Sequence, residues 1–150
     1  RFFARCASAG ISGIIVPDMP LEEKGEVADI AAKHGVDVIS LIAPTSKERI
    51  AKIAKSATGY IYIVSSMGVT GMRSEITTDL ESIVRVVKEN TSVPAAIGFG
   101  INTPEQAKKY AGIADGVIVG SAIVKIIEKY GENAAEPVYN YVKEMADAVK

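Results

Sequence analysis

Five apolar runs of strand length alternate along the chain with segments that have the hydrophobic spacing of helices. The runs cover residues 13–18, 36–43, 60–65, 93–99 and 116–120. They are continuous rather than interrupted by alternate polar residues, which predicts buried strands of a parallel sheet with both faces covered. Right-handed crossovers through the intervening helices follow from that order. The pattern predicts one domain, residues 1–150, built from five βα units.

Capping signals predict where the helices begin and end. A helix is predicted from about Leu21 to His34, with Gly35 as its stop. Three later helices are predicted from capping boxes, the last with proline at the first helical position: Thr45-Ser46-Lys47-Glu48, Thr78-Asp79-Leu80-Glu81 and Thr103-Pro104-Glu105-Gln106. The predicted inward stripes are Leu21, Val27, Ile30 and Ala31; Leu80, Ile83, Val84 and Val87; and Val138, Tyr141, Val142, Met145 and Val149.

The first residues have the pattern of a helix that lacks its own beginning. Phe3, Cys6 and Ala7 are spaced i, i+3, i+4, but no capping residue and no strand come before them. We therefore expect the sequence to be a piece of a longer protein.

Composition limits the classes of partner. Hydrophobic residues make up 48% of the 150 residues, which is enough for a packed core, and 17 basic and 18 acidic residues are mixed along the chain, which predicts no nucleic-acid surface. The apolar runs are far shorter than the roughly 18 residues of a membrane span, so no membrane is expected and the location is predicted to be cytoplasmic. One cysteine, Cys6, and one histidine, His34, allow no zinc cluster. Cys6 is predicted to lie in the core and His34 at a solvated helix end.

The last two apolar runs both end in glycine. Gly100 follows the run 93–99, and Gly120 is followed by Ser121, which opens a short helical pattern over residues 121–127. Without a Cβ, another group can approach the backbone, and the free N–H groups of a helix start attract phosphate. One such glycine alone is better explained as an ordinary tight turn. Two in succession favour a phosphate site of the kind that the last loops and a short extra helix form in a (β/α)8 barrel.

Two architectures accommodate five parallel βα units. One is an open doubly wound sheet, and the other is a partial barrel of the (β/α)8 TIM barrel family. The first apolar run is not followed by the G-x-G-x-x-G fingerprint that marks many open sheets. The glycine-ended final strands favour the TIM barrel.

Five motifs, in order, resemble the α subunit of tryptophan synthase and span nearly the whole chain. They are Ile15-Val16-Pro17-Asp18-Met19-Pro20-Leu21-Glu22-Glu23, Ala43-Pro44-Thr45-Ser46, Tyr60-Ile61-Tyr62 with Gly68-Val69-Thr70-Gly71, Gly98-Phe99-Gly100-Ile101, and Val119-Gly120-Ser121-Ala122. The resemblance implies a TIM barrel and a lyase of tryptophan biosynthesis. The implied reaction is the retro-aldol cleavage of indole-3-glycerol phosphate to indole and glyceraldehyde 3-phosphate. Indole would pass to a pyridoxal-phosphate-dependent β subunit in an α2β2 assembly.

Position by position, the resemblance implies that the backbones of Gly71, Gly100, Gly120 and Ser121 hold the substrate phosphate. Apolar walls orient an aromatic ring in such a pocket, and the family pattern gives that place to two side chains, Tyr62 and Phe99, beside the indole and glycerol parts of the substrate. The segment 66–77 is similar to the family's loop that closes over substrate, with Thr70 as its latch. The plain alternatives are that Tyr62 and Phe99 fill the barrel and that Thr70 is an ordinary loop hydroxyl.

The chain departs from the family at the catalytic step. The family's general acid/base glutamate and the aspartate that handles the indole nitrogen lie upstream of this chain, so no catalytic residue is assigned. Asp18 ends a strand on the catalytic face, but the family motif places it near the partner subunit, and it is not assigned either. No metal or cofactor is implied for this chain, and pyridoxal phosphate is expected only in the β subunit.

Three functional hypotheses remain open from the sequence. The first is the C-terminal part of a tryptophan synthase α chain that supplies the phosphate half of the site. The second is a non-catalytic half-barrel that binds phosphates or serves in assembly, and the third is another phosphate-handling barrel, against which the loop from Gly68 to Gly71 argues. Under each, the strands at 14–16 and 117–119 would be open edges, so the chain is expected to self-associate.

Overall fold

The computed structural model describes residues 1–65 and 79–150. Five strands are present there: β1 (Gly13–Ile15), β2 (Asp37–Ile42), β3 (Ile61–Val64), β4 (Ala95–Gly98) and β5 (Gly116–Ile118). The helices are α1 (Phe2–Ser8), α2 (Gly25–Lys33), α3 (Lys47–Lys55), α4 (Leu80–Asn90), α5 (Pro104–Ala111), α6 (Ser121–Tyr130) and α7 (Ala135–Ala148), with a 3-10 turn, η1 (Gly131–Asn133), between the last two.

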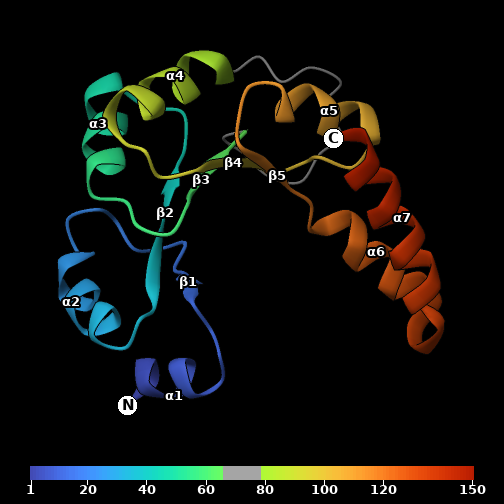
Figure 1. The fold of residues 1–150 in the computed structure, drawn as a ribbon, viewed down its shortest axis with the longest axis horizontal. Helices are drawn as coiled ribbons and strands as arrows, with labels where there is room; N and C mark the ends of the chain where they lie inside the picture. The colour runs from blue at the N-terminus through green and yellow to red at the C-terminus, as the bar shows by residue number, and fades with distance from the viewer. Residues whose placement is uncertain (66–78) are drawn as a thin grey trace.

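The five strands form one parallel sheet in the order β1-β2-β3-β4-β5, which is their order along the chain. A doubly wound sheet reverses its strand order at a switch point and so covers both faces with helices. Here every crossover advances in the same direction. The strands form an arc with α2, α3, α4 and α5 on its outer side (Figure 1). This arrangement confirms the prediction of a partial TIM barrel.

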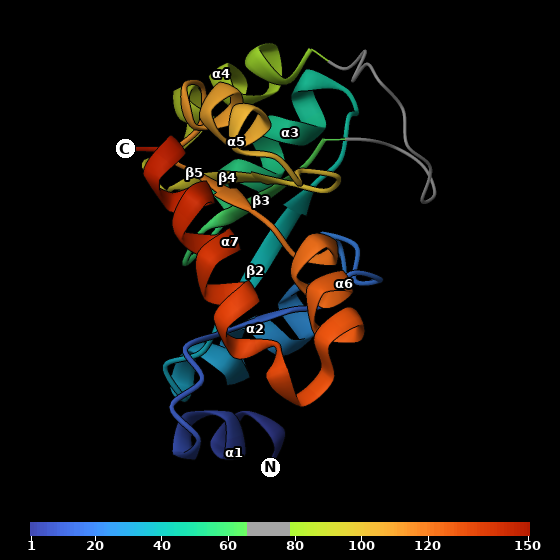
Figure 2. The same cartoon turned by 90° about the vertical axis from the view of Figure 1, so that its right-hand side faces the viewer.

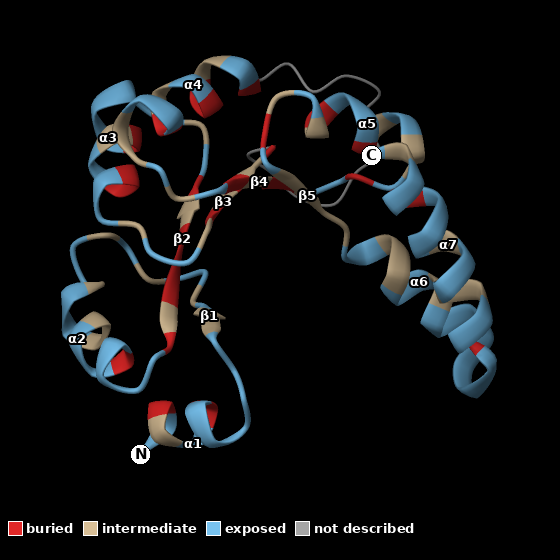
Figure 3. Cartoon of the chain, in the orientation of Figure 1, coloured by how far each residue is buried: buried red, intermediate tan, exposed pale blue. Residues whose placement is uncertain are grey.

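The two faces of the sheet differ in burial, and Figure 3 shows that both buried and half-buried residues occur along the strands. Side chains that point toward the outer helices are fully buried, as in Ile42, Ile61, Ile63 and Ile97. On the inner face, Leu41, Tyr62, Val64, Ala96 and Ile118 are half-buried. The expectation that both faces are covered is therefore wrong for the described chain. Side chains from every strand of a closed barrel fill its interior, and five strands supply only part of that filling.

The edge strands are shorter than the apolar runs that predict them. β1 ends at Ile15 instead of residue 18, and the side chain of Ile15 is 43% exposed rather than buried. β1 pairs with β2 alone, from Gly13 opposite Asp37 to Ile15 opposite Ile39. β5 likewise ends at Ile118 and pairs with β4 alone. Both predicted edges are therefore edges of the described sheet, and a strand with one neighbour has fewer hydrogen bonds to extend it.

The N-terminal helices confirm the core placement of Cys6 but not every predicted boundary. Cys6 is buried beside Phe3 in a small cluster, whereas Ala7 is exposed. Residues 21–24 form turns, and α2 begins only at Gly25. Ala31 is buried as predicted, but Ile30 is 49% exposed. His34 is exposed at the helix end, and Gly35 stops the helix with a φ of +66°.

Helix caps agree with the capping boxes to within one residue. The cap of α3 is Ser46 rather than Thr45, since the Ser46 hydroxyl accepts from the backbone N–H of Arg49. Asp79 caps α4 in the same way, while Thr78 lies outside the described residues. The box of Thr103 and Gln106 is complete, with Pro104 at the first helical position. All four predicted inward residues of α4 are buried, namely Leu80, Ile83, Val84 and Val87.

The last two helices form an arm at the β5 end of the sheet. α6 continues to Tyr130, past the predicted end at residue 127, and none of its residues is buried. α7 packs against both α6 and α5 (Figure 2). Met145 is buried and Tyr141 packs against the main core, but Val142 and Val149 are exposed, contrary to the predicted stripe. No helix in the part of the chain that the structure describes is long and apolar enough to cross a membrane.

Candidate functional site

The predicted site residues of the described chain lie on three neighbouring strands or just beyond their carboxyl ends. Tyr62 is on β3, which Ser65 follows, Phe99 and Gly100 follow β4, and Gly120 and Ser121 lie just beyond β5. Because the strands are parallel, these ends meet at one edge of the sheet. Gly98 pairs with Ile118 in register, so Gly100 and Gly120 each lie two residues beyond a paired position. The two glycine turns are therefore neighbours.

Tyr62 and Gly98 fit together on the inner face of the sheet. Tyr62 is on β3, and a Cβ added to Gly98 on β4 would overlap its hydroxyl and lie 2.7 Å from its Cε1 atom. Glycine at this position therefore lets the phenol ring lie across β4. Burial, and to a lesser degree Tyr60, raises the pKa of Tyr62, so the phenol stays neutral and can donate or accept a hydrogen bond.

The turn from β4 to α5 has an unusual backbone. Phe99 and Gly100 both have a φ of +83°, in the left-handed region that a residue with a side chain rarely adopts. Ser65 holds this conformation from the end of the neighbouring strand β3. Its backbone N–H donates to the carbonyl of Gly98 at 3.0 Å, and its Oγ donates to the carbonyl of Phe99 at 2.5 Å. Ser65 is fully buried, while the Phe99 side chain is 49% exposed.

Two more elements hold the same turn. From α5, Gln106 Oε1 accepts from the backbone N–H groups of Asn102 at 2.9 Å and Thr103 at 3.3 Å. From α7, the Tyr141 hydroxyl donates to the carbonyl of Asn102 at 2.9 Å. The Asn102 side chain donates in turn to the carbonyl of Gly100 at 3.3 Å. The chain therefore fixes this turn from β3, α5 and α7 together.

The turn from β5 to α6 is simpler. Gly120 is the N-cap of α6, and no side chain caps the first N–H groups of the helix. Space is open beside both glycines, since a Cβ added to Gly100 or Gly120 would meet no atom within 4 Å in the described structure. Backbone N–H groups at a helix start, next to free space, form the kind of place where an anion binds.

The structure thus brings Tyr62, Phe99, Gly100, Gly120 and Ser121 to one edge of the sheet. Thr70 and Gly71, with the loop 66–77, lie outside the described residues. Asp18 lies in a turn after β1, on the edge strand farthest from β5.

Sequence reasoning missed the roles of Ser65, Gln106 and Tyr141 in supporting the site. Gln106 was identifiable as a capping-box residue, and Tyr141 as an inward one. In the sequence pattern, Ser65 is only the last residue of the apolar run 60–65, and nothing there indicates that its hydroxyl binds another turn.

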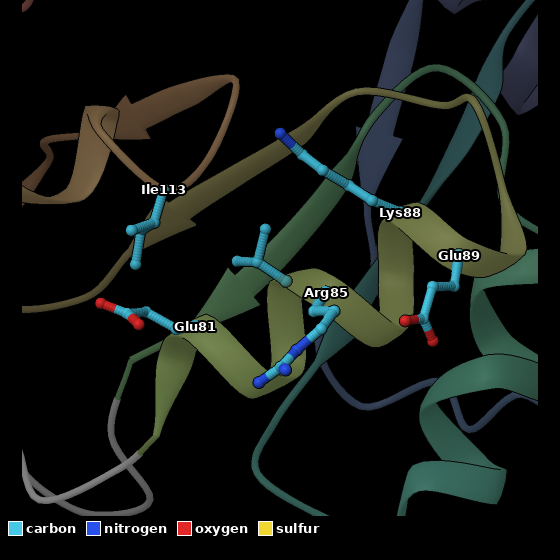
Figure 4. A pocket seen from close by; sticks show the side chains of 6 residues that line it. Glu81, Arg85, Lys88, Glu89 and Ile113 are labelled. Atoms are coloured by element: carbon cyan, nitrogen blue, oxygen red, sulfur yellow. The ribbon is translucent and has the colours of Figure 1, made fainter.

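One surface groove of the described chain lies elsewhere. It measures about 450 Å³ and is lined by Glu81, Val84, Arg85, Lys88, Glu89 and Ile113 (Figure 4). Five of these residues belong to α4, on the outer side of the sheet. The groove is open to solvent, and its charged residues have both signs, so it provides no preference for an anion.

Metal ligation has no visible basis in the described residues. Within residues 1–65 and 79–150, no three His, Cys, Asp or Glu side chains are grouped so that they could hold a metal ion.

Comparison with known proteins gives a consistent result. The family model described as tryptophan synthase alpha chain matches residues 1–150. The tryptophan synthase alpha chain of Lacticaseibacillus casei is 51% identical over 148 residues, which are 99% of this chain and 56% of that protein. The one from Lactiplantibacillus plantarum is 48% identical over 149 residues, again 99% of this chain and 56% of that protein.

Solved structures agree in fold. A mutant tryptophan synthase α subunit from Pyrococcus furiosus superimposes with a TM-score of 0.82 at 34% identity, covering 97% of this chain and 59% of that one. Subunit α from Campylobacter jejuni gives 0.82 at 32% identity, covering 96% and 57%. The chain therefore spans about half the length of the relatives it matches. Its sequence and its fold place it in the tryptophan synthase alpha chain family.

Proposed function

We propose that this chain supplies the phosphate-binding half of a lyase site that cleaves indole-3-glycerol phosphate to indole and glyceraldehyde 3-phosphate, in tryptophan biosynthesis. The observation that carries the proposal is the pair of glycine turns on neighbouring strands, with open space beside both backbones. Membership of the tryptophan synthase alpha chain family supports the identity of the substrate.

Each predicted site residue has a role in this proposal. The backbone N–H groups of Gly100, Gly120 and Ser121 bind the phosphate, together with Gly71. Tyr62 and Phe99 flank the indole and glycerol parts of the substrate, and the exposed ring of Phe99 suits that position better than the filling of a closed interior. Thr70 latches the loop 66–77 over the substrate.

The bond-breaking step needs groups that this chain does not provide. Carbon–carbon cleavage of the substrate requires proton transfer, and a positioned acid or base typically contributes about 10²- to 10⁴-fold in rate. We assign no catalytic residue within residues 1–150, because the family resemblance implies that the family's two carboxylates lie upstream of these residues. The 150-residue chain alone is therefore expected to cleave the substrate no faster than background. Addition of the upstream βα units in trans is expected to restore activity.

The partners follow from the same proposal. Indole passes to a tryptophan synthase β subunit in an α2β2 assembly. This chain uses no cofactor of its own, and pyridoxal phosphate belongs to the β subunit. A biosynthetic role of this kind places the protein in the cytoplasm.

The alternative is a non-catalytic half-barrel that binds phosphate or serves in assembly. The half-buried apolar inner face and the two edge strands favour self-association of the chain.

A lysine on the inner face of the edge strand β5 tests self-association. Val117 on β5 is not suited for this substitution, because its side chain lies on the same side of the sheet as Ile97 and packs against the outer core. Ile118 shares the inner side with Gly98. Ile118→Lys is expected to weaken association in sedimentation experiments, while Glu128→Lys on exposed α6 leaves it unchanged. A concentration-independent parent monomer of about 15.8 kDa argues against self-association.

Calorimetric titration of the 150-residue chain with glycerol 3-phosphate tests the phosphate site. The parent is expected to bind weakly, and Gly120→Val to abolish binding by placing a branched side chain in the open space beside the turn. Equal binding by parent and variant would place the site elsewhere. Cleavage of indole-3-glycerol phosphate by the chain alone would contradict the assignment of catalysis to the upstream part.

A further inference from the structure

The contact between Ser65 and Phe99 fixes the direction of a neighbouring N–H group. In a planar trans peptide, the carbonyl of one residue and the N–H of the next point in opposite directions. The Phe99 carbonyl points at the Oγ of Ser65, which is fully buried. The N–H of Gly100 therefore points away from Ser65. No atom of residues 1–65 or 79–150 lies within 4 Å of a Cβ added to Gly100 itself.

The orientation of this peptide is not the one that Phe99 would adopt unaided. A φ of +83° is unfavourable for phenylalanine, at a cost of order 1–2 kcal/mol relative to the right-handed region. Burial does not hold the residue there, because its side chain is 49% exposed. The side-chain hydrogen bond that the structure shows to the Phe99 carbonyl comes from Ser65. Within the same turn, the Asn102 and Tyr141 side chains bind the carbonyls of Gly100 and Asn102 instead.

We propose that Ser65 is a positioning residue that aims the backbone N–H of Gly100 at the phosphate of the substrate. This inference rests on the proposed function, because it concerns the same phosphate site. Ser65 does not touch the phosphate in this proposal. It acts through the Phe99 carbonyl, and it carries the effect from β3 to the turn after β4. Without its hydroxyl, the Phe99–Gly100 peptide can rotate, and one donor to the anion is lost.

Three variants of the 150-residue chain separate positioning from general stability. Ser65→Ala removes the hydroxyl, and Ser65→Thr restores it. Ser56→Ala is a matched control, because the Ser56 hydroxyl also donates to a backbone carbonyl, that of Ile53, but at the end of α3. Glycerol 3-phosphate is titrated into each 15N-labelled protein, and the amide signals of Gly100 and Ser121 are followed by NMR.

In Ser65→Ala, the dissociation constant for glycerol 3-phosphate is expected to rise about 10-fold, as when one hydrogen bond to a charged group is lost. The ligand-dependent shift of the Gly100 amide should disappear, while that of Ser121 at saturating ligand remains. Ser65→Thr should recover both the affinity and the Gly100 shift, and Ser56→Ala should match the parent. A purely structural defect would instead diminish the Gly100 and Ser121 shifts together.

The two possible failures are distinct. If the parent binds glycerol 3-phosphate and Ser65→Ala binds it equally well, with the Gly100 shift retained, the positioning role is overturned and the phosphate site stands. Equal loss of both shifts also overturns the positioning role. If the parent binds no glycerol 3-phosphate, the phosphate site itself is refuted, and the role of Ser65 with it.

Discussion

The two glycine turns of this chain have the same sequence pattern but different support. After β4, side chains from β3, α5 and α7 hydrogen-bond to the turn, and two successive residues have a φ of +83°. After β5, Gly120 has a φ of −120°, and no side-chain cap is present on α6. None of the residues of α6 is buried, whereas α5 buries Ala107 and Tyr110.

Position in the sheet explains the difference. β4 lies between β3 and β5, so its turn has a neighbouring strand on each side, and one of them provides Ser65. β5 is an edge strand of the described sheet and has one neighbour only. Residues beyond a central strand can be fixed by contacts within this chain, whereas a turn at the edge has half of those contacts available. We infer that the β4 turn is the rigid part of the candidate site and the β5 turn the adaptable one.

The largest effect is expected where the β4 turn meets Tyr62. Gly98→Ala places a methyl group against the phenol ring, at 2.7 Å from Cε1, and should destabilise the fold by about 1–3 kcal/mol, as overpacking of a core typically does. Urea unfolding monitored by circular dichroism measures the loss.

A double-mutant cycle tests whether the ring is the cause. Tyr62→Leu removes the ring atoms that crowd Gly98, so Gly98→Ala should cost less in that background than in the parent. Equal costs in the two backgrounds would mean that the Tyr62 ring moves aside freely.

The next effect compares the two glycines directly. Gly100→Ala meets no atom of the described residues within 4 Å but must keep a φ of +83°, so a loss of about 1–2 kcal/mol is expected. Gly120→Ala has equally open space and a negative φ, and its free energy of unfolding should stay within about 0.5 kcal/mol of the parent. Thermal and urea unfolding of both variants give the comparison. Similar losses at the two positions would remove the distinction between the turns.

A smaller effect is expected from the α7 contact. Tyr141→Phe deletes the hydroxyl that donates to the Asn102 carbonyl and should lower the free energy of unfolding by about 0.5–1.5 kcal/mol. Tyr139→Phe, on the same helix and 65% exposed, is the control and should change little. If the two substitutions are equivalent in urea unfolding, α7 does not stabilise the β4 turn through this bond.

The sequence predicts the fold well wherever the signal is local. The capping box at Thr103 and the inward stripe of α4 are present as predicted, because hydrogen bonds and spacing within one helix decide them. The five strands are also in the predicted order. The prediction that the inner face is covered was wrong. An apolar run shows that a strand is apolar on both sides, but it does not show whether enough strands are present to cover both faces.

The candidate site was only partly predictable for a related reason. Glycines mark the turns, but the residue that fixes the first turn, Ser65, lies 34 positions before the carbonyl it binds. Contacts over such separations depend on strand register, which residue spacing in one sequence does not specify. Ile30 and Val142 are exposed, yet they fit the apolar stripe of a helix as well as buried residues do. The spacing of a stripe does not show how far the element that packs against the helix extends.

The smallest effect on the free energy of unfolding is expected from a substitution at Asp115. This substitution tests whether the difference between the two turns arises only from contacts at the carboxyl edge of the sheet. At the opposite end of the same strand pair, Asp115 Oδ2 accepts from the backbone N–H of Ala95 at 2.9 Å, and Oδ1 pairs with Lys88 at 3.1 Å. The Ala95 N–H, and then Lys88, lower the pKa of this carboxyl. A lowered pKa in the folded state stabilises the fold above the carboxyl's ordinary pKa, near pH 4, and this stabilisation is lost as the pH falls through the lowered value.

Asp115→Asn should therefore cost less than about 1 kcal/mol at pH 7, since the pair with Lys88 is half exposed. The difference from the parent should shrink as the pH falls below about 4 and through the lowered pKa of Asp115, because the parent's carboxyl becomes neutral there too. Asp147→Asn is the control, since Asp147 is an exposed residue near the end of α7 that pairs with Lys150 and holds no strand. Urea unfolding between pH 3 and pH 7 measures the stability of both variants.

Because Asp115 joins β4 to β5 without touching either turn, the glycerol 3-phosphate affinity of Asp115→Asn should equal that of the parent at pH 7. A weakened affinity would show that the strand pair as a whole, and not the local support of each turn, sets the geometry of the site.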